Sequence, residues 1–168
     1  MEHEKNEHNS APHDESMQNS TWLKLFIMTV ISFIAMYFLM YSMIDSINDL
    51  HPSINQAYMA GSMATAMITI ELIVMGSMYK NRTARFGLIA ASVILTIVLV
   101  LLTRYQTGID DKDFLRSMIP HHSGAILMCA NENLVDQEIR ELCSQISEGQ
   151  QREIDQMNAI RARLGGSQ

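Results

Sequence analysis

The stretch Phe86–Thr103, with the sequence FGLIAASVILTIVLVLLT, decides the fold of this chain. It contains no charged side chain and is dominated by branched apolar residues. An apolar segment of about 20 residues is long enough, as a helix, to cross the hydrocarbon core of a bilayer. The stretch therefore predicts a membrane-spanning helix.

Two further apolar runs precede this stretch, at residues 23–44 and 57–79. Trp22 stands at the start of the first run, as expected of an anchor at the membrane interface. That run is too long for the apolar part of a secretory signal, so we expect it to remain in the mature protein. The second run contains Glu71, which we expect near mid-membrane, where a carboxylate is costly. It either has a function beside a polar cavity, or is protonated and bonded to a hydroxyl of a neighbouring span.

Methionines recur every fourth residue in the second run, at Met59, Met63, Met67 and, beyond Glu71, Met75. A row of thioethers could form a path for copper through the bilayer. Methionine is also simply an apolar side chain that packs well. We favour packing and anchoring, because three spans would need to oligomerise to form a path.

The basic residues Lys80, Arg82 and Arg85 lie between the second and third runs. Short loops rich in Lys and Arg stay in the cytoplasm. This rule predicts a cytoplasmic amino terminus in an inner (cytoplasmic) membrane. It also places the loop 45–56, and everything after Arg104, on the periplasmic or extracellular side.

The chain thus divides into three parts. Residues 1–21 are polar and are expected to form a disordered tail, whose histidines (His3, His8 and His13) are either incidental or transient metal chelators. Residues 22–104 are the membrane domain, with spans at about 23–44, 57–79 and 86–103. Residues 105–168 are expected to form an exported helical domain.

That last domain is predicted to be an antiparallel hairpin of two helices, so the fold class is all-α. Asp110, Asp111 and Asp113 favour a helix start, and Asp136 favours a second one after a short turn. Two such helices alone bury too little apolar surface to be stable. We therefore expect a second copy to complete a four-helix bundle by dimerisation, or packing against the membrane domain.

The hairpin carries residues that suit a soft metal. Imidazole and thioether groups favour copper(I) over zinc, magnesium or calcium. The candidate ligands are Met118, His121, His122, Met128 and Met157. Carboxylate or amide groups that could orient the imidazoles are Glu148, Gln151 and Glu153. The alternative interpretation is a core helix with satisfied histidines and methionines as fillers.

The two cysteines, Cys129 and Cys143, fall at matching levels of the predicted hairpin. In an oxidising compartment we favour a disulfide between them. In the reduced state both would be soft metal ligands.

The segment Met118–Ala125, MIPHHSGA, with Phe114 before it and Met128 after it, resembles the signature of domain-of-unknown-function family 305. The stretch Ile146–Met157 resembles that family's second helix. The resemblance covers roughly residues 110–164. It implies a ferritin-like helical unit, usually exported, and a link to copper binding and tolerance.

We therefore expect a membrane-anchored protein that binds Cu(I) for sequestration, delivery or tolerance, and no enzyme. Membrane lipid, a second copy and other copper-handling proteins are its expected partners. The net charge of −6 gives no footprint for nucleic acid. The alternative is an interaction module without metal. A ferritin-like oxidoreductase is disfavoured, because no Glu stands three residues before any of the 6 histidines.

Overall fold

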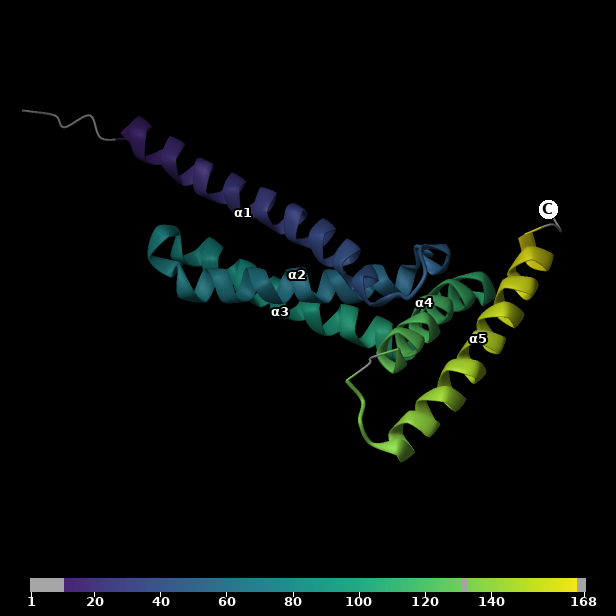
Figure 1. Ribbon diagram of the computed structural model, residues 1–168. Coiled ribbons are helices and arrows are strands. Elements are labelled where there is room, and N and C mark those ends of the chain that lie inside the picture. Colours follow the sequence, from purple (N-terminus) through teal and green to yellow (C-terminus); the bar gives the residue numbers. More distant parts are fainter. Residues whose placement is uncertain (1–10, 131–132, 166–168) are drawn as a thin grey trace, which may run out of the picture.

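The computed structural model describes residues 11–130 and 133–165, and this part of the chain contains helices joined by short connections and no strand (Figure 1). The all-α fold class is confirmed for these residues. The α-helices are α1 (Ala11–Leu39), α2 (Ile54–Val74), α3 (Arg82–Tyr105), α4 (Asp111–Cys129) and α5 (Gln137–Gly165). Short 3-10 helices lie between them: η1 (Met40–Met43), η2 (Ile47–Asp49) and η3 (Gly76–Met78).

Three stretches are long and apolar enough to cross a membrane: Asn19–Met43, Ile54–Val74 and Arg82–Tyr105. They coincide with the three apolar runs of the sequence. Their large apolar side chains are mostly exposed, and α3 buries only Ser92. Such exposure fits helices whose surroundings are lipid rather than water.

Hydroxyl groups join α2 to α3, and α2 also packs against α1. Thr65 and Thr96 share a hydrogen bond of 2.8 Å between their Oγ1 atoms, and Thr69 Oγ1 lies 2.7 Å from Ser92 Oγ. Interhelical hydrogen bonds of this kind support packing where lipid removes the hydrophobic driving force.

The first helix begins earlier than the sequence pattern suggested. Helix α1 starts at Ala11, inside the expected disordered tail 1–21. Pro12 is compatible with this start, because the first turn of a helix does not use its backbone N–H groups. Residues 1–10, with His3 and His8, lie outside the described part of the chain.

The second helix ends earlier than expected, at Val74 rather than near residue 79. The chain turns at η3, where the carbonyl of Gly76 accepts a hydrogen bond from the Arg85 guanidinium. Glu71 therefore lies in the last turn of α2. Its side chain is hydrogen-bonded to that of Tyr79.

Helices α4 and α5 form the expected antiparallel hairpin. Its core consists of Leu115, Ile119, Ile154 and Met157. Figure 1 shows α4 between α5 and the ends of the three apolar helices, and α4 contacts α2, η1 and η2. The hairpin thus packs against the connection between α1 and α2, one of the two arrangements expected from its small size.

Candidate functional site

Helix α4 carries the two adjacent histidines, His121 and His122, and their side chains lie on different faces of the helix. The helix starts where Asp110 accepts a hydrogen bond of 2.8 Å from the backbone N–H of Asp113. It continues through Pro120 to Cys129. One face of α4 packs against α5, and another contacts the connection that follows α1.

His122 lies on the face toward α5 and is 8% exposed. Its Nδ1 is 2.9 Å from the carbonyl oxygen of Met118, and its Nε2 is 2.7 Å from Oε2 of Glu153. Because a carbonyl oxygen only accepts, Nδ1 must carry a hydrogen. The bond from Nδ1 to the Met118 carbonyl fixes the ring and directs Nε2 toward α5. In metal-binding histidines the nitrogen that does not bind the metal is commonly held by such a bond.

Two thioethers belong to the same interface. Met157 is 9% exposed in the hairpin core, and Met118 packs against that core. Met157 lies one helical turn after Glu153, the residue that His122 contacts. The structure thus gathers Met118, His122 and Met157, together with Glu153, between α4 and α5.

The other predicted ligands lie outside this face. His121 is exposed, and its ring centroid lies 6.0 Å from that of His122 with the planes at 76°. Met128 is 65% exposed. Glu148 is exposed, and the exposed Gln151 donates a 3.0 Å hydrogen bond to Asp155. Of the three residues expected to orient an imidazole, only Glu153 contacts one.

Sequence reasoning missed the role of the two residues after the histidine pair. Ser123 is fully buried, and its Oγ accepts a hydrogen bond of 2.8 Å from the backbone N–H of Asp45. At Gly124 an added Cβ would lie 3.0 Å from the carbonyl oxygen of Met43. The adjacent small residues Ser123 and Gly124 were the feature of the sequence that could have indicated close packing of another backbone segment here.

A second contact missed from the sequence joins the α1–α2 connection to α5. The Arg161 guanidinium donates a hydrogen bond to Nε2 of His51, whose Nδ1 donates to the carbonyl of Leu50 at 2.9 Å. Burial lowers the pKa of His51, and the positive charges of Arg161 and Arg116 lower it further. The Leu50 carbonyl and Asp49 act in the opposite direction on that pKa.

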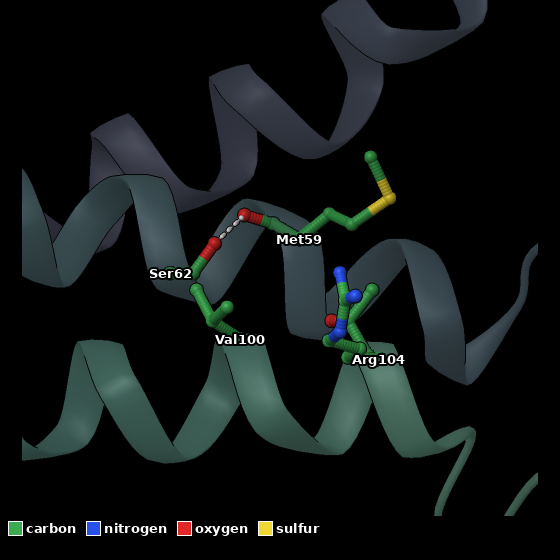
Figure 2. Close-up of a pocket in the computed structure, with 5 residues that line it drawn as sticks. Met59, Ser62, Val100 and Arg104 are labelled. Carbon is green, nitrogen blue, oxygen red and sulfur yellow. Dashed lines mark hydrogen bonds between the residues drawn. The ribbon is translucent and has the colours of Figure 1, made fainter.

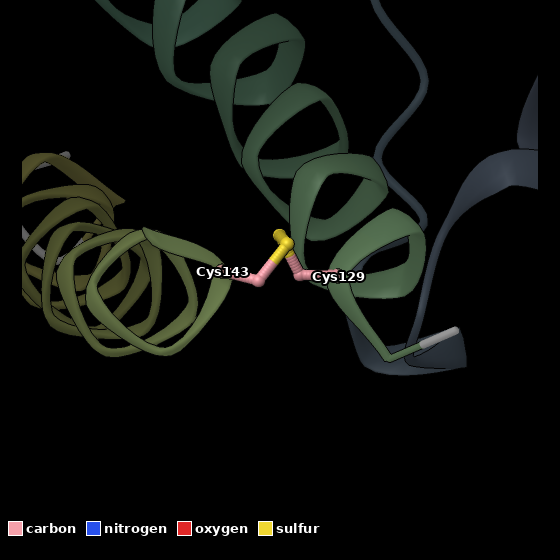
Figure 3. Close-up of a disulfide and its surroundings, with 2 residues drawn as sticks. All are labelled: Cys129 and Cys143. Atoms are coloured by element: carbon pink, nitrogen blue, oxygen red, sulfur yellow. A yellow bond between two sulfur atoms is a disulfide. The ribbon is translucent and has the colours of Figure 1, made fainter. Parts of the chain in front are cut away.

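The cysteines close the hairpin near its turn. Cys129 at the end of α4 and Cys143 in α5 form a disulfide, with their Cα atoms 5.0 Å apart (Figure 3). This separation lies in the usual range for disulfides. In this form the two sulfur atoms are bonded to each other and are not a pair of free thiolate ligands.

The chain matches a family model and a viral protein. A family model described as Domain of unknown function (DUF305) matches residues 99–164. The viral relative is "Uncharacterized protein L153" of Acanthamoeba polyphaga mimivirus, 34% identical over 151 residues, covering 86% of this chain and 93% of that protein. The chain belongs to the DUF305 family.

The viral likeness extends beyond the DUF305 segment. Since 86% of the chain cannot fit within residues 99–168, the aligned region includes part of the apolar helices. No solved structure matches this chain.

Proposed function

We propose that this DUF305 protein is a membrane-anchored copper(I)-binding protein whose site lies between α4 and α5. The ligands would be Nε2 of His122 and the thioethers of Met118 and Met157. The observation that carries the proposal is the fixed ring of His122, held at Nδ1 by the Met118 carbonyl with Nε2 directed at α5. The protein would serve copper sequestration, delivery or tolerance.

The donor set supports a soft metal. Thioethers and imidazole suit Cu(I), whereas carboxylate and carbonyl oxygens suit harder ions. In the ranges 11–130 and 133–165, no three side chains of His, Cys, Asp or Glu come together in a way that could hold a metal. A site on this face would therefore depend on its methionines.

Glu153 would compete with the metal. Its carboxylate contacts Nε2 of His122, the nitrogen that a metal would need, while the Glu153 side chain is 57% exposed. An exposed carboxylate can turn back to water at little cost, because solvent screens its interaction with the imidazole. Metal binding would thus replace the hydrogen bond to Glu153 with coordination at Nε2, and the hydrogen shared by the two groups would be released to solvent.

The second candidate function is an interaction module without metal. The observation that favours it is that both ring nitrogens of His122 already have protein partners. On this hypothesis the pair His122–Glu153 only ties α4 to α5, and Ser123 and Gly124 only dock the hairpin.

The membrane placement and the oligomer are part of the same proposal. The basic residues Lys80, Arg82 and Arg85 support a cytoplasmic amino terminus and an exported hairpin. Apolar side chains remain exposed near the disulfide end of the hairpin, among them Leu127, Met128, Ile139 and Leu142. A second copy covering them would complete the four-helix bundle, which light scattering of the detergent-solubilised protein would detect.

The test is a Cu(I) titration of the full chain in detergent micelles, against a competing chromogenic chelator. The variants are Met118→Leu, His122→Gln and Met157→Leu, since Met and Leu are similar in volume. His121→Gln and Met128→Leu are matched controls from outside the face. We expect each of the first three to weaken binding at least tenfold and the controls to leave it unchanged.

Absence of Cu(I) binding by the folded wild-type chain, with helicity verified by circular dichroism, would overturn the copper proposal. The interaction module would then be the function to pursue.

A further inference from the structure

A groove lies between α2 and α3 at the end of the apolar helices that faces the hairpin (Figure 2). Its volume is about 340 Å³, and it is lined by Met59, Ser62, Val100, Thr103 and Arg104. The groove is separate from the α4–α5 face, and its interpretation does not depend on copper binding.

The walls of the groove are apolar in effect, although two hydroxyls line it. Ser62 Oγ donates to the carbonyl of Met59 at 2.8 Å, and Thr103 Oγ1 donates to the carbonyl of Leu99 at 3.0 Å. Both hydroxyls are therefore satisfied by the backbone of their own helices. Met59 and Val100 leave 37% and 48% of their surface exposed, so the groove is open to its surroundings.

Arg104 is the one charged group of the groove. It belongs to the last turn of α3 and to the final residues of the stretch Arg82–Tyr105, which is apolar enough to cross a membrane. Figure 2 shows its side chain rising from α3 toward α2. Among the described residues, none forms a hydrogen bond or an ion pair with this guanidinium.

The end of the groove is held in place by two hydrogen bonds between α2 and the chain after α3. Tyr58 donates to the carbonyl of Thr107 at 3.2 Å, and Gln106 donates to Asn55 at 3.3 Å. These polar groups beside the groove therefore have partners, whereas Arg104 has none in the part of the chain that the structure describes.

We propose that this groove binds one phospholipid, with an acyl chain against Met59 and Val100 and the phosphate on Arg104. The end of a membrane span is the depth at which lipid phosphates lie. A guanidinium matches a phosphate with two parallel hydrogen bonds, and Arg is the preferred residue for such recognition. The apolar wall and the single unpaired cation are complementary to a lipid tail and its headgroup.

The experiment is native mass spectrometry of the full chain in detergent, titrated with dioleoylphosphatidylglycerol. Dioleoylglycerol, which has the same acyl chains but no phosphate, is the matched ligand. Arg104→Gln removes the cation, and Val100→Trp fills the groove. Arg82→Gln, at the opposite end of α3, and Val98→Trp, which does not line the groove, are the control variants.

We expect one tightly held phosphatidylglycerol per chain and weaker binding of the diacylglycerol. Arg104→Gln should weaken phosphatidylglycerol binding about fivefold, the typical effect of one basic residue at an anionic membrane surface. Val100→Trp should reduce binding of both lipids, and neither control should change it.

Equal binding of the two lipids, or unchanged binding by Arg104→Gln, would overturn the phosphate contact. Unchanged binding by Val100→Trp would overturn the groove as the site. A dimer that dissociates in Val100→Trp would instead show a second copy in the groove, and the proposal would be wrong.

Discussion

The backbone N–H of Asp45 donates a 2.8 Å hydrogen bond to the buried Oγ of Ser123, and so joins the α1–α2 connection to the middle of α4. At the next residue, Gly124, a methyl group would fit only if the Met43 carbonyl oxygen, 3.0 Å from the added Cβ, moved away by a few tenths of an ångström. Ser123 and Gly124, the two residues directly after the histidine pair, therefore serve to dock the hairpin.

Gly124→Ala should destabilise the docked hairpin. The new Cβ would lie 3.0 Å from a backbone oxygen, and overpacking of this kind costs about 1–3 kcal/mol. Thermal unfolding followed by circular dichroism would measure the loss. Gly149→Ala in α5 is the matched control, since it meets nothing within 4 Å. It should be neutral or stabilise by up to about 1 kcal/mol. Equal unfolding temperatures for both variants would contradict the close approach.

Reduction of Cys129–Cys143 should loosen the hairpin near its turn. The disulfide links residues 14 apart, and closing a loop of that length contributes about 3 kcal/mol in the chain-entropy account. Amide hydrogen exchange in the first turns of α5 should therefore quicken when a reductant is added. The double variant Cys129→Ser and Cys143→Ser should exchange quickly with or without reductant. Exchange that is insensitive to reductant in the wild type would contradict a stabilising role.

Protonation of His51 in acid should weaken the docking of α5 on the α1–α2 connection. Its folded-state pKa lies below the usual 6.5, so folding favours the neutral ring that accepts from Arg161. The stabilisation is present in full above pH 6.5 and is lost as the pH falls through the lowered pKa. Arg161 and Arg116 both oppose the protonated ring, while Asp49 favours it.

The measurement is the spin-label distance between the α1–α2 connection and the end of α5, recorded from pH 7.5 downward. We expect the distance distribution to broaden in acid for the wild type. His51→Gln, which cannot gain a charge, should give the same distribution at every pH. A wild-type distribution that does not change with pH would show that His51 has no such role.

Glu153→Ala should strengthen Cu(I) binding, on the proposal that His122 is a ligand. Removal of the carboxylate frees Nε2, and a hydrogen bond to a charged, part-exposed group would account for about five- to tenfold in affinity. Glu148→Ala removes an exposed carboxylate from the same helix and is the control. The chelator competition described above measures both. Equal Cu(I) affinities of the two variants would show that Glu153 does not compete with the metal for Nε2 of His122.

Much of the architecture followed from local patterns. The run at Phe86–Thr103 predicted α3, and the acidic residues at Asp110–Asp113 predicted the start of α4, because apolar length and capping are properties of short segments. The end of α2 could not be predicted in this way. It depends on a hydrogen bond from Arg85 to Gly76, which only the folded connection brings together.

The candidate site was predictable only in part. The types of side chain at Met118, His122 and Met157 were visible in the sequence, and so was the pairing of the two helices. To predict the contact of His122 with Glu153, the register of α4 against α5 would have to be known to better than one helical turn. Arg161 and His51 are separated by 110 residues, and no local pattern connects a lone histidine in a loop with an arginine on a distant helix.

The placement of the α1–α2 connection constrains how the chain is made. Since this connection touches both α4 and α5, it must be on the same side of any bilayer as the hairpin. During synthesis this connection is made before α4, and α4 emerges on the same side when α2 and α3 both cross the bilayer. A chain in which only one of α2 and α3 crossed the bilayer would leave its hairpin on the opposite side from the connection. Docking of the hairpin is therefore sensitive to the number of spans that precede it and not to the direction in which the chain is inserted.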